Sequence, residues 1–236
     1  RGLVMTIHST GGKPELSRLT IGHMPLADAA PLLWAQHRGH FEAAGLDVKL
    51  VCEASWASLR DRLAWGVFDA AQCLAPMPLA AQLGIDGAAV PMVSALCLSR
   101  GGSSVTLSMR LLDALDISPE APPAVVARAI ANRAEYGPPL RFAHVFAYSM
   151  HHYLLRDWLE SGGVDTDTRV EFRVAPPPQM VRLLEAGEVD GFCAGEPWST
   201  AAMLRGQGRP VVASRQIWAG GPEKVLGVTA EWARRH

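Results

Sequence analysis

The stretch at residues 191–198 combines residue types that together could hold a small anion. Residues 189–194 are apolar apart from Asp190, a pattern that predicts a buried strand of a parallel sheet. Pro197 lacks an amide proton and has a fixed φ, which suits the first turn of a helix. A strand that ends at a helix N-terminus presents unpaired backbone amides, and Gly195 lets a ligand approach them closely. The stretch therefore predicts an anion-binding site.

The same stretch offers an alternative chemistry, in which Cys193 is a nucleophile and His151 its base. A cysteine inside an apolar strand is more often an inert core residue. The sequence also lacks G-x-S-x-G, a P-loop motif, and G-x-G-x-x-G after the first predicted strand. We therefore expect no enzymatic activity, and keep a small-molecule transferase or hydrolase on the same fold as the alternative.

No metal or cofactor is predicted, because His23, His37 and His40 are scattered about a predicted helix without reliable ligand spacing. Glu196 would repel an anion, so we expect its carboxylate to cap the following helix or to pair with a base. The net charge of -1 argues against nucleic acid as a direct partner, since no basic excess is present to neutralise phosphates.

A membrane span needs about 18 consecutive apolar residues. Proline or glycine interrupts every long apolar run of this sequence well before that length. Residues 1–16 lack the apolar segment of a signal peptide, so either a signal precedes the numbering or the protein stays in the cytoplasm, with Met5 as a possible start. The cysteines are widely spaced and are expected to be buried free thiols, which leans toward a reducing compartment; they are Cys52, Cys73, Cys97 and Cys193.

Strands and helices alternate along the chain, which predicts an α/β fold of parallel sheets with helices on both faces. The expected strands are 19–22, 46–51, 68–72, 90–98, 105–108, 141–145, 170–174, 189–194, 210–213 and 225–228. The expected helices are 28–44, 56–65, 78–83, 124–136, 149–161, 179–186 and one that begins at Pro197.

Glycine-rich stretches near 99–104 and 209–214 predict two crossings between two lobes. We expect an N-terminal extension at 1–18, a first lobe formed by 19–104 and 210–236, and a second lobe formed by 105–209. Ligands of open α/β sheets gather beyond the carboxyl ends of the strands. The turns after the strands are therefore expected to line a cleft between the lobes.

Five motifs in a fixed order resemble those of one protein family: GHMPLADAAP at 22–31, ASWAS at 54–58, LAPMP at 74–78, GFCAGEPW at 191–198 and PEKVLGV at 222–228. They are similar to motifs of the nitrate and bicarbonate solute-binding proteins of ABC transporters and of the cytoplasmic nitrate/nitrite sensors derived from them. The resemblance implies a type II periplasmic-binding-protein fold that closes on its ligand by hinge motion. Relatives are longer, so the C-terminal part of the first lobe is expected to be truncated.

The resemblance also implies the site residues. Lys224, which by itself would be an ordinary solvated lysine, matches the lysine that carries the charge of the anion pocket. His151 matches a histidine that donates to the anion from a helix start, and Trp56 matches an aromatic residue that stacks on planar nitrate. Ala194 and Gly195 would complete the pocket with backbone amides.

Ser103 stands where relatives carry a longer amide side chain, so its contact with the anion would be weaker or indirect. Trp198 is expected to pack rather than to bind.

The implied function is the binding of nitrate or nitrite, with bicarbonate as an alternative. The implied partners are membrane permease subunits of an ABC transporter, if the protein is periplasmic, or an RNA-binding antiterminator protein, if it is a cytoplasmic sensor. The lack of a visible signal favours the sensor.

Overall fold

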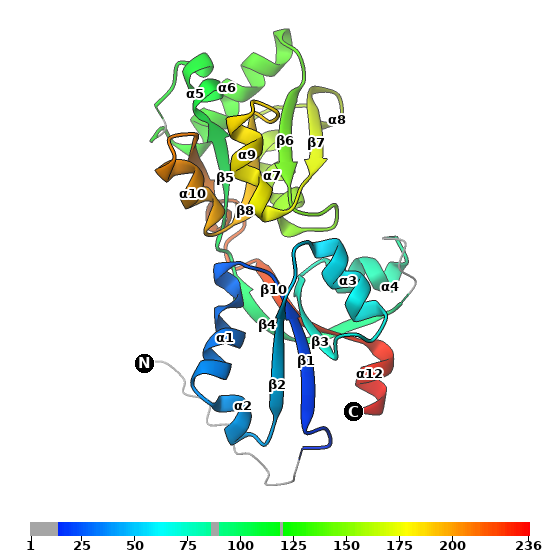
Figure 1. Ribbon diagram of the computed structural model, residues 1–236. Coiled ribbons are helices and arrows are strands. Elements are labelled where there is room, and N and C mark those ends of the chain that lie inside the picture. The colour runs from blue at the N-terminus through cyan, green and yellow to red at the C-terminus, as the bar shows by residue number, and fades with distance from the viewer. Residues whose placement is uncertain (1–13, 86–89, 119) are drawn as a thin grey trace.

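The computed structural model describes residues 14–85, 90–118 and 120–236, and its strands form two separate sheets (Figure 1). The first sheet has the order β2 (Asp47–Cys52), β1 (Arg18–His23), β3 (Ala70–Leu74), β10 (Pro222–Thr229) and β4 (Met92–Arg100). The second has the order β7 (Val170–Val174), β6 (Leu140–His144), β8 (Gly191–Gly195), β5 (Ser103–Ser108) and β9 (Gly208–Ala213). We call each sheet with its helices a lobe. Most of the predicted extension at 1–18 lies outside the described residues.

Helices accompany both sheets, and this confirms the predicted α/β class with two lobes. The first lobe carries η1 (Ala27–Ala29), α1 (Ala30–His37), α2 (His40–Ala43), α3 (Trp56–Ala64), α4 (Met77–Leu83) and α12 (Ala230–Arg235). The second lobe carries α5 (Met109–Leu115), α6 (Pro123–Tyr136), α7 (Met150–Ser161), α8 (Thr166–Arg169), η2 (Pro177–Gln179), α9 (Met180–Glu185), α10 (Trp198–Leu204) and α11 (Ser214–Ile217). Within the described part of the chain, no helix is long and apolar enough to cross a membrane.

Each sheet is mixed rather than wholly parallel. β1 runs parallel to β2 and β3, and β6 runs parallel to β7 and β8. β10 and β5 run antiparallel to both of their neighbours. These two strands are the ones that enter a sheet directly after a crossing, so their direction is set by the return from the other lobe and not by a βαβ connection.

The first crossing is the turn at Gly101 and Gly102, whose φ angles of 66° and 88° suit glycine. The second crossing runs from Ser214 to Gly221, after β9 has ended. The strand that we predicted at 210–213 and assigned to the first lobe therefore pairs with β5 in the second sheet. β9 is an edge strand, where Pro210 is tolerated, and the crossing itself is a short helix followed by glycines.

The helix predicted at 28–44 is interrupted twice. Residues 27–29 form a 3-10 turn, and Gly39 adopts a left-handed conformation with φ of 69° between α1 and α2. Asp28 lies in this 3-10 turn, and its side chain reaches Lys224 at the junction of the lobes.

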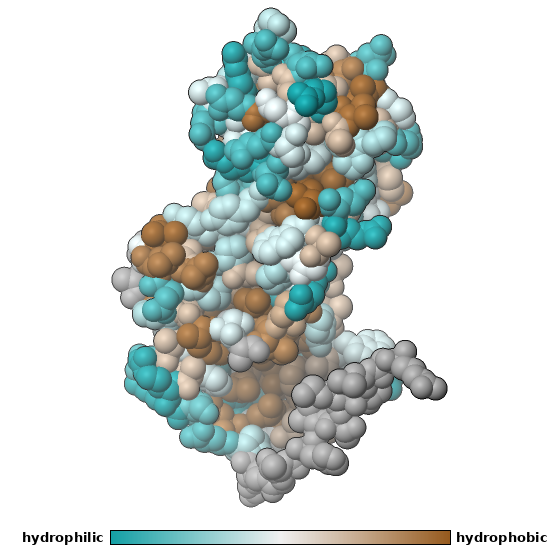
Figure 2. All heavy atoms as spheres, turned by 180° about the vertical axis from the view of Figure 1, so that it is seen from behind, coloured by the Kyte–Doolittle hydropathy of each residue, from teal (hydrophilic) through white to brown (hydrophobic). Residues whose placement is uncertain are grey.

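A continuous apolar cluster joins the two lobes. It contains Met24, Trp56 and Leu74 from the first lobe together with Val145 and Phe192 from the second. The space-filling view from behind shows the lobes meeting with side chains between them, where the ribbon view leaves a gap (Figure 2). The lobes are therefore packed against each other, and polar groups at their junction are removed from water.

The cysteine prediction is half right. Cys73 and Cys193 are buried free thiols in interior strands. Cys52 and Cys97 are also free but exposed. The difference follows from sheet order, because Cys52 lies on β2 and Cys97 on β4, and these are the two edge strands of the first sheet.

Candidate anion-binding site

Lys224 lies at the junction of the lobes and is fully buried. Its Nζ is 2.8 Å from Asp28 Oδ2 and 3.0 Å from Glu223 Oε1. Burial by itself lowers the pKa of a lysine, but the carboxylates of Glu223 and Asp28 outweigh it and raise the pKa of Lys224 above its ordinary value. Lys224 is therefore a permanent cation in a dry environment, and not the solvated lysine that its sequence context alone would suggest.

An irregularity in β10 explains how two neighbouring charged side chains are both buried. Successive side chains of a regular strand point to opposite faces. The pairing of β10 with β4 shifts register on both sides of Lys224, as at a β-bulge, which re-aims side chains locally. Glu223 and Lys224 are consequently 1% and 0% exposed.

Asp28 is held in place by a buried glutamine. Gln72 Nε2 donates to Asp28 Oδ1 at 2.6 Å, and Gln72 Oε1 accepts from the amide of Met24 at 2.9 Å. Gln72 is fully buried in β3, the strand next to β10. The carboxylate is thus fixed in the position from which it reaches Lys224.

The predicted residue His151 approaches the same cluster from the second lobe. It lies in the first turn of α7, which Ser149 caps by accepting from the amide of His152 at 3.2 Å. His151 is fully buried, and its Nε2 is 3.4 Å from Glu223 Oε1. Burial first, and then the charge of Lys224, lower the pKa of His151 well below its usual range. The imidazole is therefore neutral at pH 7.

Trp56 approaches from the first turn of α3, where Ser55 caps the helix by accepting from the amide of Ser58 at 3.1 Å. The indole is 1% exposed, and Lys224 Nζ lies 5.6 Å from the ring centroid, within the range of a cation–π contact. Trp56 Nε1 is buried and has no hydrogen-bond partner among the described residues.

Gly195, at the end of β8, lies against these groups. A Cβ built on it would be 3.8 Å from Asp28 Oδ2 and 3.9 Å from His151 Nε2. Ser103 is the ladder partner of Gly195, and it is buried with an Oγ that has no partner in the described structure. Ala194 is fully buried within the apolar cluster.

The structure thus links Lys224, His151, Trp56 and Gly195 by direct proximity, and it brings in Ser103 through the register of β5 and β8. Ala194 is adjacent in sequence but packs in the core. The residues that sequence reasoning missed are Asp28, Gln72 and Glu223. Two of them were visible as signals, because Asp28 falls within the motif at 22–31 and Glu223 directly precedes Lys224.

Several buried polar atoms at this junction lack a hydrogen-bond partner. Trp56 Nε1, His151 Nδ1 and Ser103 Oγ have none among the described residues, and His151 Nε2 has only the 3.4 Å contact with Glu223 Oε1. Such atoms occur elsewhere in the described chain too, for example in Thr106 and Trp198. Trp56, His151 and Ser103 lie next to Lys224 or Gly195, and Ser99, whose Oγ also lacks a partner in the described structure, is the ladder partner of Lys224. Buried polar groups are normally satisfied, so the arrangement suits a small ligand that accepts hydrogen bonds.

A shallow apolar groove of about 350 Å³ borders the cluster. It crosses the lobe boundary between α4 and α7, and its lining includes Pro222 and Met150. Pro222 is close in sequence to Lys224, and Met150 precedes His151. Tyr148 Oη donates to the carbonyl of Ile85 at 2.7 Å across this boundary. The groove therefore marks the outer edge of the interlobe junction.

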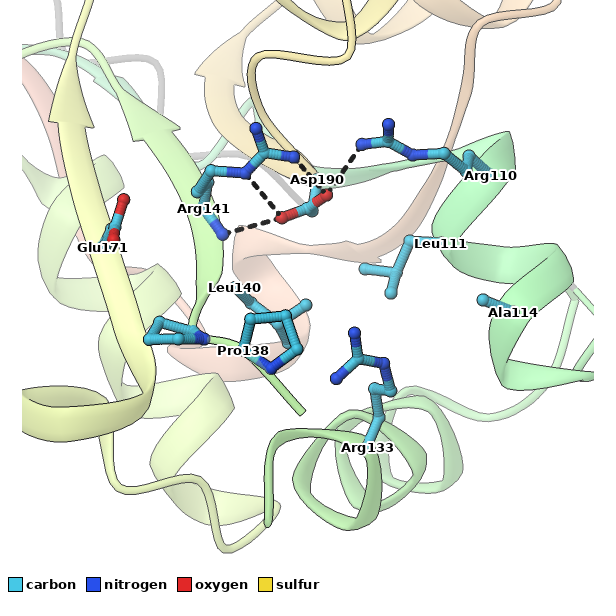
Figure 3. A pocket seen from close by; sticks show the side chains of 10 residues that line it. Arg110, Leu111, Ala114, Arg133, Pro138, Leu140, Arg141, Glu171 and Asp190 are labelled. Atoms are coloured by element: carbon cyan, nitrogen blue, oxygen red, sulfur yellow. Dashed lines mark hydrogen bonds and ion pairs between the residues drawn. The ribbon is translucent and has the colours of Figure 1, made fainter. Parts of the chain in front are cut away.

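A second cavity, of about 510 Å³, lies in the second lobe at the opposite end of its sheet (Figure 3). Its charged wall is formed by Asp190, which directly precedes β8, with Arg110 and Arg141 pointing at the carboxylate. Arg110 Nη2 is 2.9 Å and Arg141 Nη2 is 3.1 Å from Asp190 Oδ1. This cavity lies beyond the amino ends of the parallel strands, whereas ligands of open α/β sheets gather beyond the carboxyl ends. Arg110 and Arg141 already share Asp190 as an acceptor, and a third guanidinium, that of Arg133, also lines the cavity.

Neither Cys193 nor Glu196 supports other chemistry. Burial first, and then the charge of Glu223, raise the pKa of the Cys193 thiol well above its ordinary value, so no thiolate is available. Glu196 accepts from the amide of Thr200 at 3.1 Å, which confirms the predicted cap of α10. Trp198 packs against the apolar cluster, as predicted. Among the described residues, no group of three or more His, Cys, Asp or Glu side chains is placed to hold a metal.

The two lobes with a polar cluster at their junction have the architecture of periplasmic binding proteins. A model of the NMT1-like family matches residues 12–236, and the chain belongs to this family. The crystal structure of the periplasmic nitrate-binding protein NrtA from Synechocystis PCC 6803 superimposes with a TM-score of 0.83 at 31% identity, covering 95% of this chain and 58% of NrtA. That similarity confirms the predicted periplasmic-binding-protein-like fold and the resemblance to nitrate-type solute-binding proteins.

Two curated relatives from Synechocystis sp. are more similar in sequence. The nitrate import ATP-binding protein NrtC is 40% identical over 228 residues, and the bicarbonate transport ATP-binding protein CmpC is 38% identical over 224 residues. These matches cover 96% and 94% of this chain but only 33% of each relative. The chain thus spans about a third of the length of these relatives.

Proposed function

We propose that the chain binds one small monovalent oxyanion, nitrate or nitrite, at the junction of its lobes. The observation that carries this proposal is the buried cation Lys224, surrounded by donors without acceptors that come from both lobes. A charge-assisted hydrogen bond in a dry site is stronger than one in water. The similarity to NrtA, a nitrate-binding protein by name, supports the same ligand class.

Each predicted residue has a distinct role in this proposal. Lys224 neutralises the charge of the anion, and Trp56 donates from Nε1 while its ring packs beside the ligand. His151 and Ser103 donate from the second lobe. The backbone amide of Gly195 completes the pocket, whereas Ala194 packs in the core. Because ligand contacts come from both lobes, binding stabilises the closed arrangement over an open one.

The chain acts as a binding protein without turnover. The similarity to solute-binding proteins supports this, and so does the absence of an available thiolate at Cys193. Transporter subunits are the proposed partners, since NrtC is by name an import protein for nitrate. The alternative partner, an RNA-binding antiterminator, rests on the motif resemblance alone. Bicarbonate is the second candidate ligand, because CmpC is almost as similar as NrtC.

Isothermal titration calorimetry with nitrate, nitrite and bicarbonate in a chloride background tests the proposal. We expect saturable binding of nitrate or nitrite at one site per chain. Lys224→Met should weaken binding at least about 100-fold, because a hydrogen bond to a charged group contributes about 1.5–3 kcal/mol and the neutralising charge is lost as well.

The matched control is Lys49→Met, which removes an exposed lysine from β2 of the same lobe and should leave the affinity unchanged. Circular dichroism of each variant establishes that it is folded. Retained affinity in a folded Lys224→Met protein would disprove the site. Tight binding of bicarbonate with none of nitrate or nitrite would favour the second candidate.

A further inference from the structure

The charges at the lobe junction do not balance before an anion arrives. Among the residues that the structure describes, Asp28 pairs with Lys224, and Glu223 pairs with Lys224 and His151. Asp28 also accepts from the uncharged Gln72. With a neutral His151, one positive charge faces two negative charges, so the cluster carries an excess of one negative charge.

Burial makes this excess significant. The side chains of Lys224, Glu223 and Asp28 are 0%, 2% and 12% exposed. Water and salt therefore screen the cluster poorly. A monovalent anion placed beside Lys224 would bring a second excess negative charge within a few ångströms of two carboxylates. Like charges repel each other in a buried site. This repulsion raises the proton affinity of the ionisable side chains in the cluster, and one of them then takes up a proton.

We propose that the site takes up one proton together with each anion, and that the pair formed by His151 and Glu223 holds this proton. The inference rests on the proposed function. The geometry supports the pair as the acceptor, since His151 Nε2 and Glu223 Oε1 are 3.4 Å apart and a proton on the imidazole can bridge them. The added proton then lies between His151 Nε2 and Glu223 Oε1, beside Gly195 and the proposed position of the anion. The proton comes from solvent, and no covalent bond changes.

The surroundings of His151 determine the sign of the pH dependence. The titratable groups that act on it are Lys224, Glu223 and Asp28 from the first lobe and His144 from the second. In the free protein, burial and then Lys224 lower the pKa of His151, so the ring is neutral. A bound anion raises that pKa. Binding is therefore tightest at low pH and weakens as pH rises through the pKa of the bound form.

The decisive measurement is calorimetry of the whole chain with nitrate at pH 7 in two buffers of different ionisation enthalpy, PIPES and Tris. The apparent binding enthalpy should differ between the buffers by an amount that corresponds to about one proton per nitrate. The dissociation constant should rise about tenfold per pH unit between the two pKa values of His151. Saturable nitrate binding with the same heat in both buffers would overturn this inference and leave the proposed function intact. Absence of anion binding would overturn both.

Glu223→Gln identifies the residues involved. It keeps an acceptor for Lys224 but removes one negative charge, so proton uptake should fall toward zero and the dissociation constant should lose most of its pH dependence. Glu53→Gln is the matched control, because Glu53 is a buried carboxylate of the same lobe that pairs with Arg62 at 2.9 Å. It should keep the proton uptake of the wild type. Full proton uptake by a folded Glu223→Gln protein would refute the assignment, and the wild-type buffer comparison tests the coupling even if that variant does not fold.

Discussion

Two charged clusters of this molecule have opposite compositions and opposite environments. At the lobe junction, Lys224 faces the carboxylates of Asp28 and Glu223, and these side chains are at most 12% exposed. At the far end of the second lobe, the carboxylate of Asp190 faces two arginines, Arg110 at 59% and Arg141 at 30% side-chain exposure. Water can screen the surplus charge of the second cluster but not that of the first. Only the buried cluster can therefore impose a charge requirement on a ligand.

The largest expected difference between the two clusters is in how much a substitution lowers the free energy of unfolding. Lys224→Met leaves two buried carboxylates without their cation, and breaking a buried ion pair on one side costs about 3–5 kcal/mol of unfolding free energy. Asp190→Asn keeps an acceptor for its neighbours in a partly solvated place, so we expect a loss of about 1–2 kcal/mol. Urea unfolding without added anion measures both.

The double variant Lys224→Met/Glu223→Gln provides the control, since it removes one of the stranded charges and should recover part of the loss. Asp190→Asn should leave the affinity for nitrate unchanged. Equal destabilisation by Lys224→Met and Asp190→Asn would mean that burial does not distinguish the two clusters.

Acid sensitivity is the next effect in size. Burial first, and then the charge of His152, lower the pKa of His144 from 6.5 to about 4. The unfolded chain thus binds more protons than the folded chain between these values. The contribution of His144 to stability is present above pH 6.5 and is lost as pH falls toward 4. Between pH 6.5 and 5 this loss amounts to about 2 kcal/mol.

Urea unfolding of wild type and His144→Asn at pH 8, 7.5, 6.5 and 5 tests this sign. The variant should lose less stability than wild type between pH 6.5 and 5, while the difference between the two proteins stays constant from pH 8 to 7.5. His144 Nδ1 lies 2.9 Å from the carbonyl of Phe146, a contact that asparagine can keep. A variant with the full acid sensitivity of wild type would show that other groups cause it.

These comparisons also show which parts of the molecule a sequence can predict. The starts of α3 and α7 were predictable because Ser55 and Ser149 are good caps, and each cap fixes a functional side chain one or two positions later. The place of Lys224 in the candidate site was predictable only from the motif at 222–228, because the local sequence context favours an exposed lysine.

The carboxylates of the junction were not predicted, for two physical reasons. Alternation along a strand places Glu223 and Lys224 on opposite faces, and the irregular register of β10 cannot be read from residue types. Asp28 was assigned to a long helix that in fact begins with a separate 3-10 turn. The second crossing was placed too early because the glycines near residue 209 resemble a linker, whereas β9 is an edge strand of the second sheet and the chain crosses only after it.

The smallest expected effect separates two indoles. Trp56 Nε1 has no partner among the described residues, whereas Trp158 Nε1 donates to the carbonyl of Pro123 at 3.2 Å. Trp56→Phe should therefore weaken nitrate binding about fivefold, by the roughly 1 kcal/mol of one hydrogen bond, with little effect on the unfolding free energy of the free protein. Trp158→Phe should do the reverse, lowering stability by about 1 kcal/mol and leaving the affinity unchanged.

Calorimetry and urea unfolding of the two variants distinguish the two roles. A donor whose bond stabilises the fold must affect the unfolding free energy, whereas a donor that binds only the ligand need not. If Trp56→Phe lowers stability as much as Trp158→Phe does and leaves nitrate affinity intact, then Trp56 is a core residue and the anion lies elsewhere in the junction.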